Sequence, residues 1–538
     1  MKHFDSLGVM IDCSRDAVPN ITRLKHFLDT ISKMGYNVAM LYTEETYEIQ
    51  NEPYFGYKRG RYSMEEIQEL DRYAASIGIE LIPCIQTLGH LKSLQRWRAY
   101  RHTVFDIDDI LLIDEPRTYE LIENMFATLA QTYTTRRVHI GMDEAHHVGL
   151  GKYLDKYGFT DRYELLLKHL KRVTEIAARY GFETMMWNDL FFNLSPGVFS
   201  STSVKEFPSE ILANIPKNCA MVYWDYFGTD PARYNAMIQS TQKLSDKVWF
   251  AGGAWTWNTF SPHNHYSMKR NETALSCCIQ NGVRHVLLTL WGDDGGECAY
   301  EMVLPALMHA AAIAQDLTEP EMKKRFLEIV GEDFDHFLEM DLPNYIYGEN
   351  VVVESPYFQN SACNYGKIHL YDDPFLGTMS AHLKSTDPAI MAEYAKRLHH
   401  HAENSSDYAI HYQTLACLCD VLTHKLLLAS NTRTQYLAND RDGLRALAEN
   451  DYTLCISLLD TFYKVYRKQW YTINKTYGFE IHDARLGGLK RRLESCRERL
   501  LAYVNGEIEK IEELEETLLP LKDTFITSWA EMVSANVM

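Results

Sequence analysis

The stretch LGVMIDCSRDAVPNITRLKHFLDTISKMGYNVAMLY, residues 7–42, predicts a strand, a helix and a second strand in succession. Residues 7–13 and 37–42 are short, nearly continuous apolar runs, which are typical of strands covered on both faces. The apolar positions of the segment between them fall at helical spacing: Leu24, Phe27, Leu28 and Ile31. The stretch therefore predicts one strand–helix repeat of an α/β protein.

The same alternation continues through about the first 300 residues. Eight runs are predicted to be strands: Leu7–Cys13, Asn37–Tyr42, Glu80–Ile85, Arg137–Met142, Glu183–Trp187, Ala220–Trp224, Val248–Gly252 and His285–Leu290. The helix predicted at Met64–Ser76 begins with a capping box of Ser63 and Glu66. Eight such repeats predict a (β/α)8 TIM barrel at residues 1–304. An open, doubly wound sheet is the alternative, although no glycine-rich phosphate loop follows the first run.

The pattern changes after Leu304, where strand-like runs become rare and helical periods dominate. Residues 305–538 are therefore predicted to form a mostly α-helical C-terminal region. Within it, the segment GFEIHDARLGG (Gly478–Gly488) is unusually polar and glycine-rich. We expect a corner between two helices there, with a loop that serves the active site or a dimer contact as the alternative. The long helical region also offers surface for a homodimer.

Composition limits the classes of partner and location. The 538 residues exceed one typical core, and a net charge of −19 is a poor match for a nucleic-acid backbone. No apolar stretch is long enough to predict a membrane span, and the N-terminus lacks the pattern of a secretory signal. The 11 cysteines are scattered without metal-ligand spacing, so we expect reduced thiols in a cytoplasmic protein.

Polar or aromatic residues lie at the end of every predicted strand or just after it. They are Asp12 and Arg15; Glu44 and Glu45; His90; Asp143 and Glu144; Trp187, Asn188 and Asp189; Tyr223, Trp224 and Asp225; Trp255 and Trp257; and Trp291, Asp293 and Asp294. In a TIM barrel these positions meet at the face that carries the chemistry. Aromatic planes cover the apolar face of a pyranose ring, while charged groups bind its hydroxyls. The set therefore predicts a sugar-binding site.

The fourth run leads into VHIGMDEAHHVGLG, residues 138–151, which contains the adjacent carboxylates Asp143 and Glu144. Two carboxylates in different environments can divide the work of glycoside hydrolysis. A metal site is the alternative, because Asp143, His146 and His147 have the spacing of one helical face. The other strand ends offer mainly arginine and tryptophan. We therefore expect no metal, with His146 and His147 as loop residues and His139 as a support beneath the carboxylates.

Within that stretch, the pattern H-x-G-x-D-E at His139–Glu144 resembles the signature of glycoside hydrolase family 20, the β-N-acetylhexosaminidases. Other strand-end residues resemble sugar-contacting positions of the family in the same chain order: Arg15, His90, Trp187, Tyr223 with Asp225, and Trp291 with Asp293. The resemblance covers roughly residues 5–300, with Asp293 in the place of a glutamate. No small α/β domain precedes the first run and the helical extension is long, which implies a compact, bacterial-type intracellular branch.

The resemblance implies a retaining exo-β-N-acetylhexosaminidase that removes terminal β-linked GlcNAc through an oxazolinium intermediate, with activity on GalNAc left open. Glu144 would be the general acid and base, Asp143 would orient the acetamido group, and Tyr223 would donate a hydrogen bond to its oxygen. The remaining site residues would bind the sugar: Arg15, His90, Trp187, Trp224, Asp225, Trp255, Trp291 and Asp293. No cofactor is implied. A non-catalytic glycan-binding protein and a metal-dependent barrel hydrolase are the alternative functions.

Overall fold

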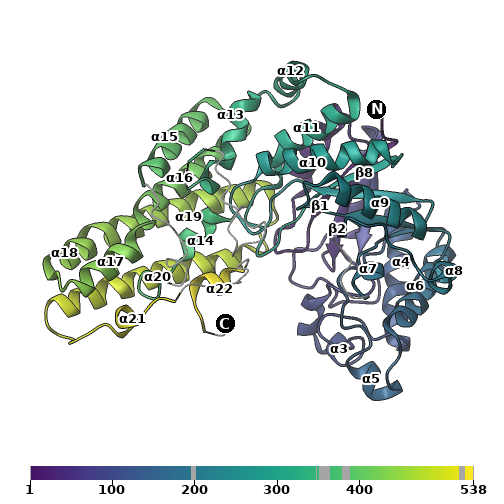
Figure 1. Ribbon diagram of the computed structural model, residues 1–538, viewed down its shortest axis with the longest axis horizontal. Coiled ribbons are helices and arrows are strands. Elements are labelled where there is room, and N and C mark those ends of the chain that lie inside the picture. The colour runs from purple at the N-terminus through teal and green to yellow at the C-terminus, as the bar shows by residue number, and fades with distance from the viewer. Residues whose placement is uncertain are drawn as a thin grey trace.

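The structure is a computed structural model that describes residues 2–194, 201–346, 348–349, 364–377, 388–519 and 528–536. Its parallel strands form a closed barrel in chain order (Figure 1). Their bounds are β1 Ser6–Asp12, β2 Val38–Glu44, β3 Glu80–Ile85, β4 Arg137–His139, β5 Glu183–Trp187, β6 Cys219–Trp224, β7 Val248–Gly253 and β8 His285–Leu290. Because β1 pairs with β8, the barrel closes, which confirms the predicted (β/α)8 fold and excludes the open sheet.

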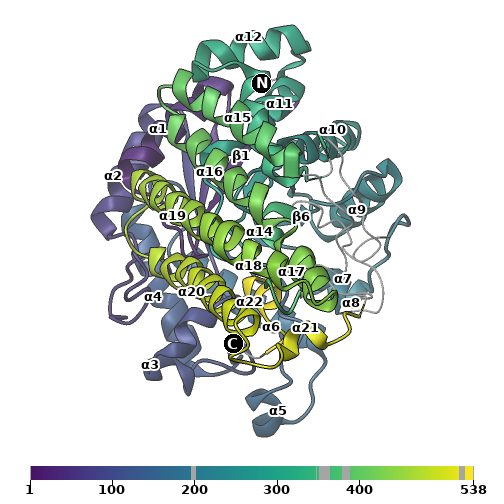
Figure 2. The ribbon, with the colours of Figure 1, turned by 90° about the vertical axis from the view of Figure 1, so that its left-hand side faces the viewer.

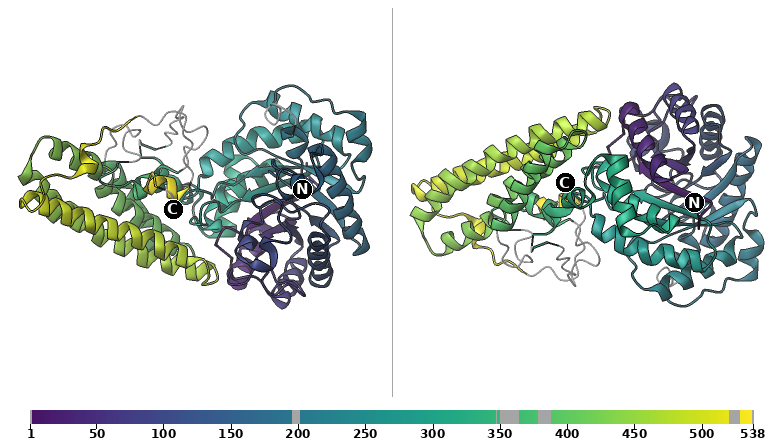
Figure 3. Two further views of the ribbon diagram at one scale, coloured as in Figure 1. Left: turned by 90° about the horizontal axis from the view of Figure 1, so that it is seen from below. Right: turned by 90° about the horizontal axis from the view of Figure 1, so that it is seen from above.

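Helices between the strands cover the outside of the barrel (Figure 3). They are α1 Ile21–Met34, α2 Met64–Ser76, α3 Arg98–Arg101, α4 Pro116–Thr132, α5 Lys152–Tyr157, α6 Arg162–Arg179, α7 Leu190–Asn193, α8 Ser209–Asn214, α9 Pro231–Leu244 and α10 Asn264–Gln280. Local signals set their ends. The side chain of Asn20 accepts a hydrogen bond from the N–H of Arg23 at the start of α1. The capping box predicted at Ser63 and Glu66 starts α2.

Side chains along each strand alternate between the barrel interior and the helical layer. In β6, Ala220 and Val222 belong to the interior cluster, whereas Met221 and Tyr223 pack in the cluster that the strands share with the helices. The chain just beyond β6 keeps this order as far as Tyr226, since Trp224 and Tyr226 pack against the interior cluster; Phe227 packs there as well, so the alternation ends at Tyr226. Along β6, whether a side chain faces the barrel interior or the helical layer therefore depends on whether its residue number is even or odd.

Strand β4 ends at His139, three residues before the end of the predicted run. The chain leaves the extended conformation there, because Gly141 and Met142 have φ values of 70° and 71°. A Cβ at position 141 would lie 2.1 Å from Oε1 of Gln86, so only glycine fits. This turn brings the two adjacent carboxylates of the sequence pattern to the mouth of the barrel.

The chain beyond β8 is mostly helical, as predicted (Figures 1 and 2). Its helices are α11 Leu304–Gln315, α12 Glu319–Val330, α13 Phe334–Leu338, α14 Tyr365–Tyr371, α15 Pro388–Asn404, α16 Ala409–Lys425, α17 Leu428–Leu437, α18 Arg441–Ala446, α19 Thr453–Ile473, α20 Phe479–Val504, α21 Glu512–Glu515 and α22 Trp529–Val533. The long helices α15, α16, α19 and α20 pack side by side in this order (Figure 2). One end of this layer meets the barrel, where Pro19 forms a backbone bridge with Asn474.

The prediction of a corner between helices at Gly478–Gly488 is wrong for all of the segment except Gly478. Gly478 caps α20 with a φ of 88°, and the helix then runs without a break from Phe479 to Val504. A Cβ at Gly478 would lie 2.1 Å from the carbonyl oxygen of Asp16, so the close approach of α20 to the barrel requires glycine. The polar residues of the segment are therefore helical and lie at the junction with the barrel.

Within the described ranges, no helix has both the length and the apolar character needed to cross a membrane. These ranges contain ten of the cysteines, and all ten are buried and free of disulfide bonds.

Candidate active site

A pocket of about 530 Å³ opens at the carboxyl ends of the strands. Its walls are Arg15, His90, Asp143, Glu144, Trp187, Trp224, Tyr226, Phe227, Trp255, Trp257, Asn258, Trp291, Asp293, Asp294, Asn364 and Ser528. Nine of the eleven predicted site residues line it; the exceptions are Tyr223 and Asp225. Its size and its mixture of aromatic and charged walls suit one or two sugar rings. A second cavity, of about 550 Å³, lies at the amino ends of the strands, at Arg137, Glu183 and Trp249.

The turn after β4 is held by two side chains from neighbouring strand ends. Gln86 Nε2 donates a hydrogen bond to Asp143 Oδ1 at 2.7 Å, and Gln86 Oε1 accepts one from the Met142 N–H at 3.2 Å. Asp189 Oδ2 accepts a hydrogen bond from the N–H of Glu144 at 2.9 Å, where Glu144 has a φ of 53°. These contacts stabilise a backbone conformation that a residue other than glycine rarely adopts.

His90 lies between the two adjacent carboxylates. Its Nε2 is 3.2 Å from Asp143 Oδ2 and 3.5 Å from Glu144 Oε2. Burial opposes a charge on His90, but the Asp143 carboxylate outweighs it and raises the pKa of His90 well above its ordinary value. Burial also opposes a charge on Asp143, yet His90 and Gln86 lower the pKa of Asp143 to about 2. Asp143 is therefore a fixed negative charge, paired with a histidinium.

Glu144 occupies a different environment from its neighbour. Its side chain is 49% exposed to the pocket, against 13% for Asp143. Beneath the pair lies a third carboxyl group, Asp189, which is fully buried. Burial, with Asp143 nearby, raises the pKa of Asp189 to about 8. Near neutral pH the protein therefore keeps Asp143 charged, Asp189 mostly protonated and Glu144 accessible to a ligand.

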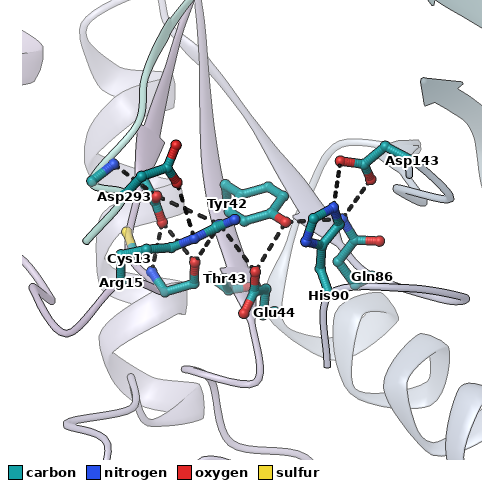
Figure 4. A network of polar contacts seen from close by, with 12 residues as sticks. Cys13, Arg15, Tyr42, Thr43, Glu44, Gln86, His90, Asp143 and Asp293 are labelled. Carbon is teal, nitrogen blue, oxygen red and sulfur yellow. Dashed lines mark hydrogen bonds and ion pairs between the residues drawn. The ribbon is translucent and has the colours of Figure 1, made fainter. Parts of the chain in front are cut away.

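Arg15 forms the centre of a charged group on the opposite wall (Figure 4). Its guanidinium lies 3.0 Å from Glu44 and 3.4 Å from Asp293, and it packs over the rings of Tyr42 and Trp291. Burial raises the pKa of Glu44 to about 7, although Arg15 opposes this shift. A planar cation held by carboxylates offers its remaining N–H groups, and the carboxylates their oxygens, to hydroxyl groups of a ligand.

A hydrogen-bonded chain connects the two walls. Tyr42 donates its hydroxyl hydrogen to Glu44 at 3.1 Å and accepts a hydrogen bond from Gln86 Nε2 at 2.9 Å. Figure 4 shows Tyr42 between Arg15 on one side and His90, Gln86 and Asp143 on the other. Tyr42 and Gln86 were not predicted from the sequence. Tyr42 lies within β2 and Gln86 directly follows β3, and neither belongs to a recognised motif.

Tryptophan rings close the floor and one side of the pocket. Trp255 and Trp257 stack at 4.0 Å between ring centroids, and Trp187 lies 6.1 Å from Trp291. Trp224 stacks on Tyr226 at 5.2 Å. The flat apolar faces of these rings are suited to an N-acetyl methyl group or the apolar face of a sugar.

Tyr223 and Asp225 face the helical layer instead of the pocket. The Tyr223 hydroxyl donates a hydrogen bond to Asp225 Oδ2 at 3.0 Å, and Arg233 forms an ion pair with the same oxygen at 2.6 Å. Alternation along β6 explains this outcome, since Tyr223 has the parity of Met221 and points outward. Tyr226 lines the pocket in their place.

Tyr226 is a pocket residue that alternation along β6 could have found. It has the parity of Val222 and Trp224, so it points to the interior side. Burial raises the pKa of Tyr226, while the neighbouring Trp291 and Thr289 side chains act to lower it. Asp143 and Glu144 lie close enough to raise the pKa of Tyr226, although burial is the larger cause of that shift. A protonated phenol thus lies beside the two carboxylates.

The histidines of the opening pattern have separate locations. His139 is fully buried, and burial lowers its pKa to about 3, so the ring is neutral. It packs 4.4 Å from Trp187 and accepts a hydrogen bond from the Gly141 N–H, which is the supporting position expected beneath the carboxylates. His146 and His147 are exposed loop residues. Among the residues that the structure describes, no group of three or more His, Cys, Asp or Glu could hold a metal ion.

Among the described residues of the helical C-terminal region, Asn364 and Ser528 line the pocket. Neither could be predicted from the sequence, because each directly precedes a helix far along the chain, α14 and α22, and belongs to no recognised motif. The pocket therefore combines loops of the barrel with residues that lie more than 70 positions beyond the last strand.

Comparisons with known proteins find matches to both halves of the chain. Residues 4–243 match the model of the glycosyl hydrolase family 20 catalytic domain. Residues 335–533 match the model of the glycoside hydrolase 20C C-terminal domain.

Curated relatives match part of the chain at low identity. Hexosaminidase D of Bos taurus is 23% identical over 256 residues, which cover 45% of this chain and 68% of the relative. Hexosaminidase D of Homo sapiens is 22% identical, over 39% of this chain and 43% of the relative. Beta-hexosaminidase 3 of Arabidopsis thaliana is 23% identical, over 37% of this chain and 40% of the relative. The chain thus spans less than half the length of the last two relatives.

Among solved structures, the GH20 exo β-N-acetylglucosaminidase from Vibrio harveyi, in complex with N-acetylglucosamine, is similar at 15% identity. The match has a TM-score of 0.47 and covers 63% of this chain and 59% of that one.

Proposed function

We propose a function from one premise, that this chain belongs to glycoside hydrolase family 20, as the two family-model matches show. The chain is a glycoside hydrolase, and we propose that it is an exo-acting β-N-acetylhexosaminidase that removes terminal β-linked GlcNAc, and also GalNAc, with retention of configuration. The observation that carries the proposal is the pairing of Asp143, held by His90 and Gln86, with an accessible Glu144 in a pocket walled by tryptophan.

The proposed first step uses the substrate's own 2-acetamido group as the nucleophile. Its carbonyl oxygen forms a bond to C1 while the bond from C1 to the leaving oxygen breaks. Glu144 gives its proton to that leaving oxygen, which departs as an alcohol, and an oxazolinium ring remains. In the second step, Glu144 takes a proton from water as the water oxygen attacks C1, and the ring opens to release the sugar. Two displacements at C1 give net retention.

Asp143 supports this mechanism through its charge. Because His90 and Gln86 keep its pKa near 2, Asp143 can accept a hydrogen bond from the acetamido N–H and offset the positive charge of the oxazolinium ring. The same carboxylate would orient the acetamido oxygen toward C1. His90, within 3.5 Å of both carboxylates, would keep Asp143 charged and hold Glu144 in place.

We assign the hydrogen bond to the acetamido oxygen to Tyr226. Tyr223, the residue suggested by the family pattern, lies in the helical layer with Asp225 and Arg233. Tyr226 lines the pocket and interacts electrostatically with Asp143 and Glu144. Trp187, Trp224, Trp255 and Trp291 would enclose the N-acetyl methyl group and the sugar face. Arg15 and Asp293, which contact one another, would bind the ring hydroxyls.

A comparison of three aryl glycosides tests the function. We expect rapid release of the aryl alcohol from the β-GlcNAc substrate, measurable release from β-GalNAc, and almost none from β-glucoside, which lacks the acetamido nucleophile. Each assay is repeated with EDTA, and the anomer first released is identified by NMR. Brisk cleavage of the glucoside would exclude substrate assistance. Loss of activity with EDTA would favour a metal-dependent hydrolase, and sugar binding without cleavage of any substrate would favour a glycan-binding protein.

A further inference from the structure

The loop that follows β8, residues 291–297, is held by the barrel on one side. The N–H of Gly292 donates a hydrogen bond to Asp12 Oδ2 at 2.9 Å. Thr256 donates one to the carbonyl oxygen of Trp291 at 2.7 Å, and the N–H of Asn258 donates one to that of Asp293 at 3.0 Å. This β8 loop supplies three walls of the pocket, namely Trp291, Asp293 and Asp294.

On its other side, the β8 loop is held by a buried cluster of two cations and two carboxylates. Lys367 of α14 contacts Asp294 at 2.6 Å and also contacts Glu297. Arg485 of α20 lies 3.0 Å from Asp294 and 3.1 Å from Glu297. The Lys367 and Glu297 side chains are at most 1% exposed, so each charge depends on its partners for stabilisation.

The helical region also holds the backbone of the β8 loop. Arg485 donates a hydrogen bond to the carbonyl oxygen of Asp294 at 2.6 Å, and His482 contacts that of Gly295 at 3.0 Å. The N–H of Trp529, the first residue of α22, donates one to Asp294 Oδ2 at 2.7 Å. Asp294 and Gly295 have φ values of 61° and 115°, a conformation that needs such support at a residue other than glycine.

The contacts are concentrated beside the sugar-facing residues. Asp294, which takes most of them, directly follows Asp293, whose carboxylate pairs with Arg15 in the pocket. A Cβ on Gly295 would lie 2.7 Å from Arg485 Nη1, so α20 and the β8 loop fit together without spare room. The polar segment Gly478–Gly488 thus contains two residues that contact the backbone of this loop, His482 and Arg485.

We propose that Lys367 and Arg485 are positioning residues of the active site, which hold the β8 loop in the conformation that faces the sugar. The helical region would then set how the enzyme discriminates among sugars at their outer hydroxyls. This inference rests on the proposed function. A cluster that served only to dock the helical region would stabilise the fold without any effect on sugar selectivity, and the two roles can be separated by experiment.

The test compares the same substitution at two positions of α20. Arg485→Lys keeps the charge but removes the fork that reaches both carboxylates. Arg492→Lys is the matched control, because Arg492 lies about two turns further along α20 and binds Asp373 through two hydrogen bonds, of 2.6 and 3.0 Å, away from the β8 loop. A third variant, Gly295→Ala, places a Cβ of the loop against Arg485 and His482 of α20 and removes no charge.

We expect Arg485→Lys and Gly295→Ala to lower kcat/KM for the aryl β-GlcNAc substrate by about tenfold or more, chiefly through KM, because small displacements of positioning groups have large effects. The ratio of kcat/KM for β-GlcNAc to that for β-GalNAc should change in both. Arg492→Lys should leave this ratio and KM within about twofold of the wild type. Urea unfolding of each variant reports the loss of stability separately.

The proposal would be overturned if Arg485→Lys and Arg492→Lys had equal effects on KM and on the ratio of kcat/KM for β-GlcNAc to that for β-GalNAc. It would also be overturned if Arg485→Lys and Gly295→Ala kept the KM and the ratio of the wild type. Binding of N-acetylglucosamine, followed by tryptophan fluorescence, is measured for every variant. A wild-type chain that binds this sugar but cleaves no substrate would refute the proposed function alone. In that case a weaker affinity in Arg485→Lys than in Arg492→Lys would still support the positioning role, and equal affinities would overturn it.

Discussion

The two tyrosines of the β6 segment allow a strict test of the active-site assignment. Tyr226→Phe removes one hydroxyl from the pocket, whereas Tyr223→Phe removes one from the helical layer, three residues earlier. The substitutions are chemically identical, so any difference in their effects must come from location. We expect the first to impair turnover and the second to affect only stability.

The magnitudes follow from the contacts of each hydroxyl. Without the Tyr226 hydroxyl the acetamido oxygen loses a group that directs it to C1, and misplacement of about 1 Å can reduce the rate by about 100-fold. This corresponds to about 2.7 kcal/mol of the activation barrier. Without the Tyr223 hydroxyl, Asp225 still accepts hydrogen bonds from the N–H groups of Phe227 and Gly228 and keeps its ion pair with Arg233. Its loss should therefore cost about 1 kcal/mol of stability.

Steady-state hydrolysis of the aryl β-GlcNAc substrate at 25 °C gives kcat for both variants, and urea unfolding gives their stability. A kcat reduced by about two orders of magnitude in Tyr226→Phe alone is the expected result. If Tyr223→Phe lost most of its activity while Tyr226→Phe kept a normal kcat, the assignment from strand alternation would be refuted. Equal and small effects on kcat would remove both residues from the mechanism.

Other expectations concern the carboxylates, the turn after β4 and the buried histidines. Glu144→Gln should lower kcat by about 10²- to 10⁴-fold with normal unfolding; near-normal turnover would remove its acid and base role. Asp143→Asn should impair turnover to a similar degree, with little change in the affinity for a glucoside lacking the acetamido group. Gly141→Ala, which forces a Cβ onto Gln86 at a φ of 70°, should lower kcat about tenfold or more through displacement of Asp143; unchanged kinetics would show that this turn tolerates a shift. Four buried histidines should make the fold less stable in acid, because burial lowers the pKa to about 3 for His139 and His369 and to about 4 for His169 and His263. Between their unfolded pKa of about 6.5 and these values, only the unfolded chain binds their protons, so they lower the free energy of unfolding as the pH falls, whereas Glu44 and Asp189, whose pKa burial raises, act in the opposite direction. Urea unfolding at pH 7 and pH 5 should therefore show that His369→Phe removes part of the acid-induced destabilisation; the same change between the two pH values in the variant and the wild type would contradict this.

The barrel could be predicted from the sequence because each strand is an apolar run bounded by an amphipathic helix. The positions of Arg15, His90, Asp143 and Glu144 in one pocket also followed, since residues after parallel strands converge at one end of a barrel. Tyr223 and Asp225 were misplaced because a short sequence pattern does not reveal which face of β6 each side chain occupies. Alternation from Val222 would have corrected this.

The contribution of the helical region could not be predicted. Asn364, Ser528 and Arg485 approach the pocket through contacts between distant segments, which leave no periodic signal in the sequence. Gly478–Gly488 was expected to break a helix because of its glycines, yet packing of α20 against α18 and α19 outweighs the low helix propensity of Gly487 and Gly488. The boundary near Leu304, the homodimer and the cytoplasmic location stay predictions.

The closure of the barrel has a consequence for how the chain folds during synthesis. Ser6 and His285 pair across the seam although 279 residues separate them. At typical rates of about 5 to 20 residues per second, a ribosome needs about 15 to 60 seconds to reach the end of β8. Until then β1 has an unpaired edge, which invites association with other chains. A fragment that stopped at residue 243, where the match to the catalytic-domain model ends, would lack β7 and β8 and keep that edge exposed. The barrel can therefore close only after β8 has been synthesised. Nascent chains shorter than about 290 residues should depend on chaperones, because the edge of β1 is still unpaired.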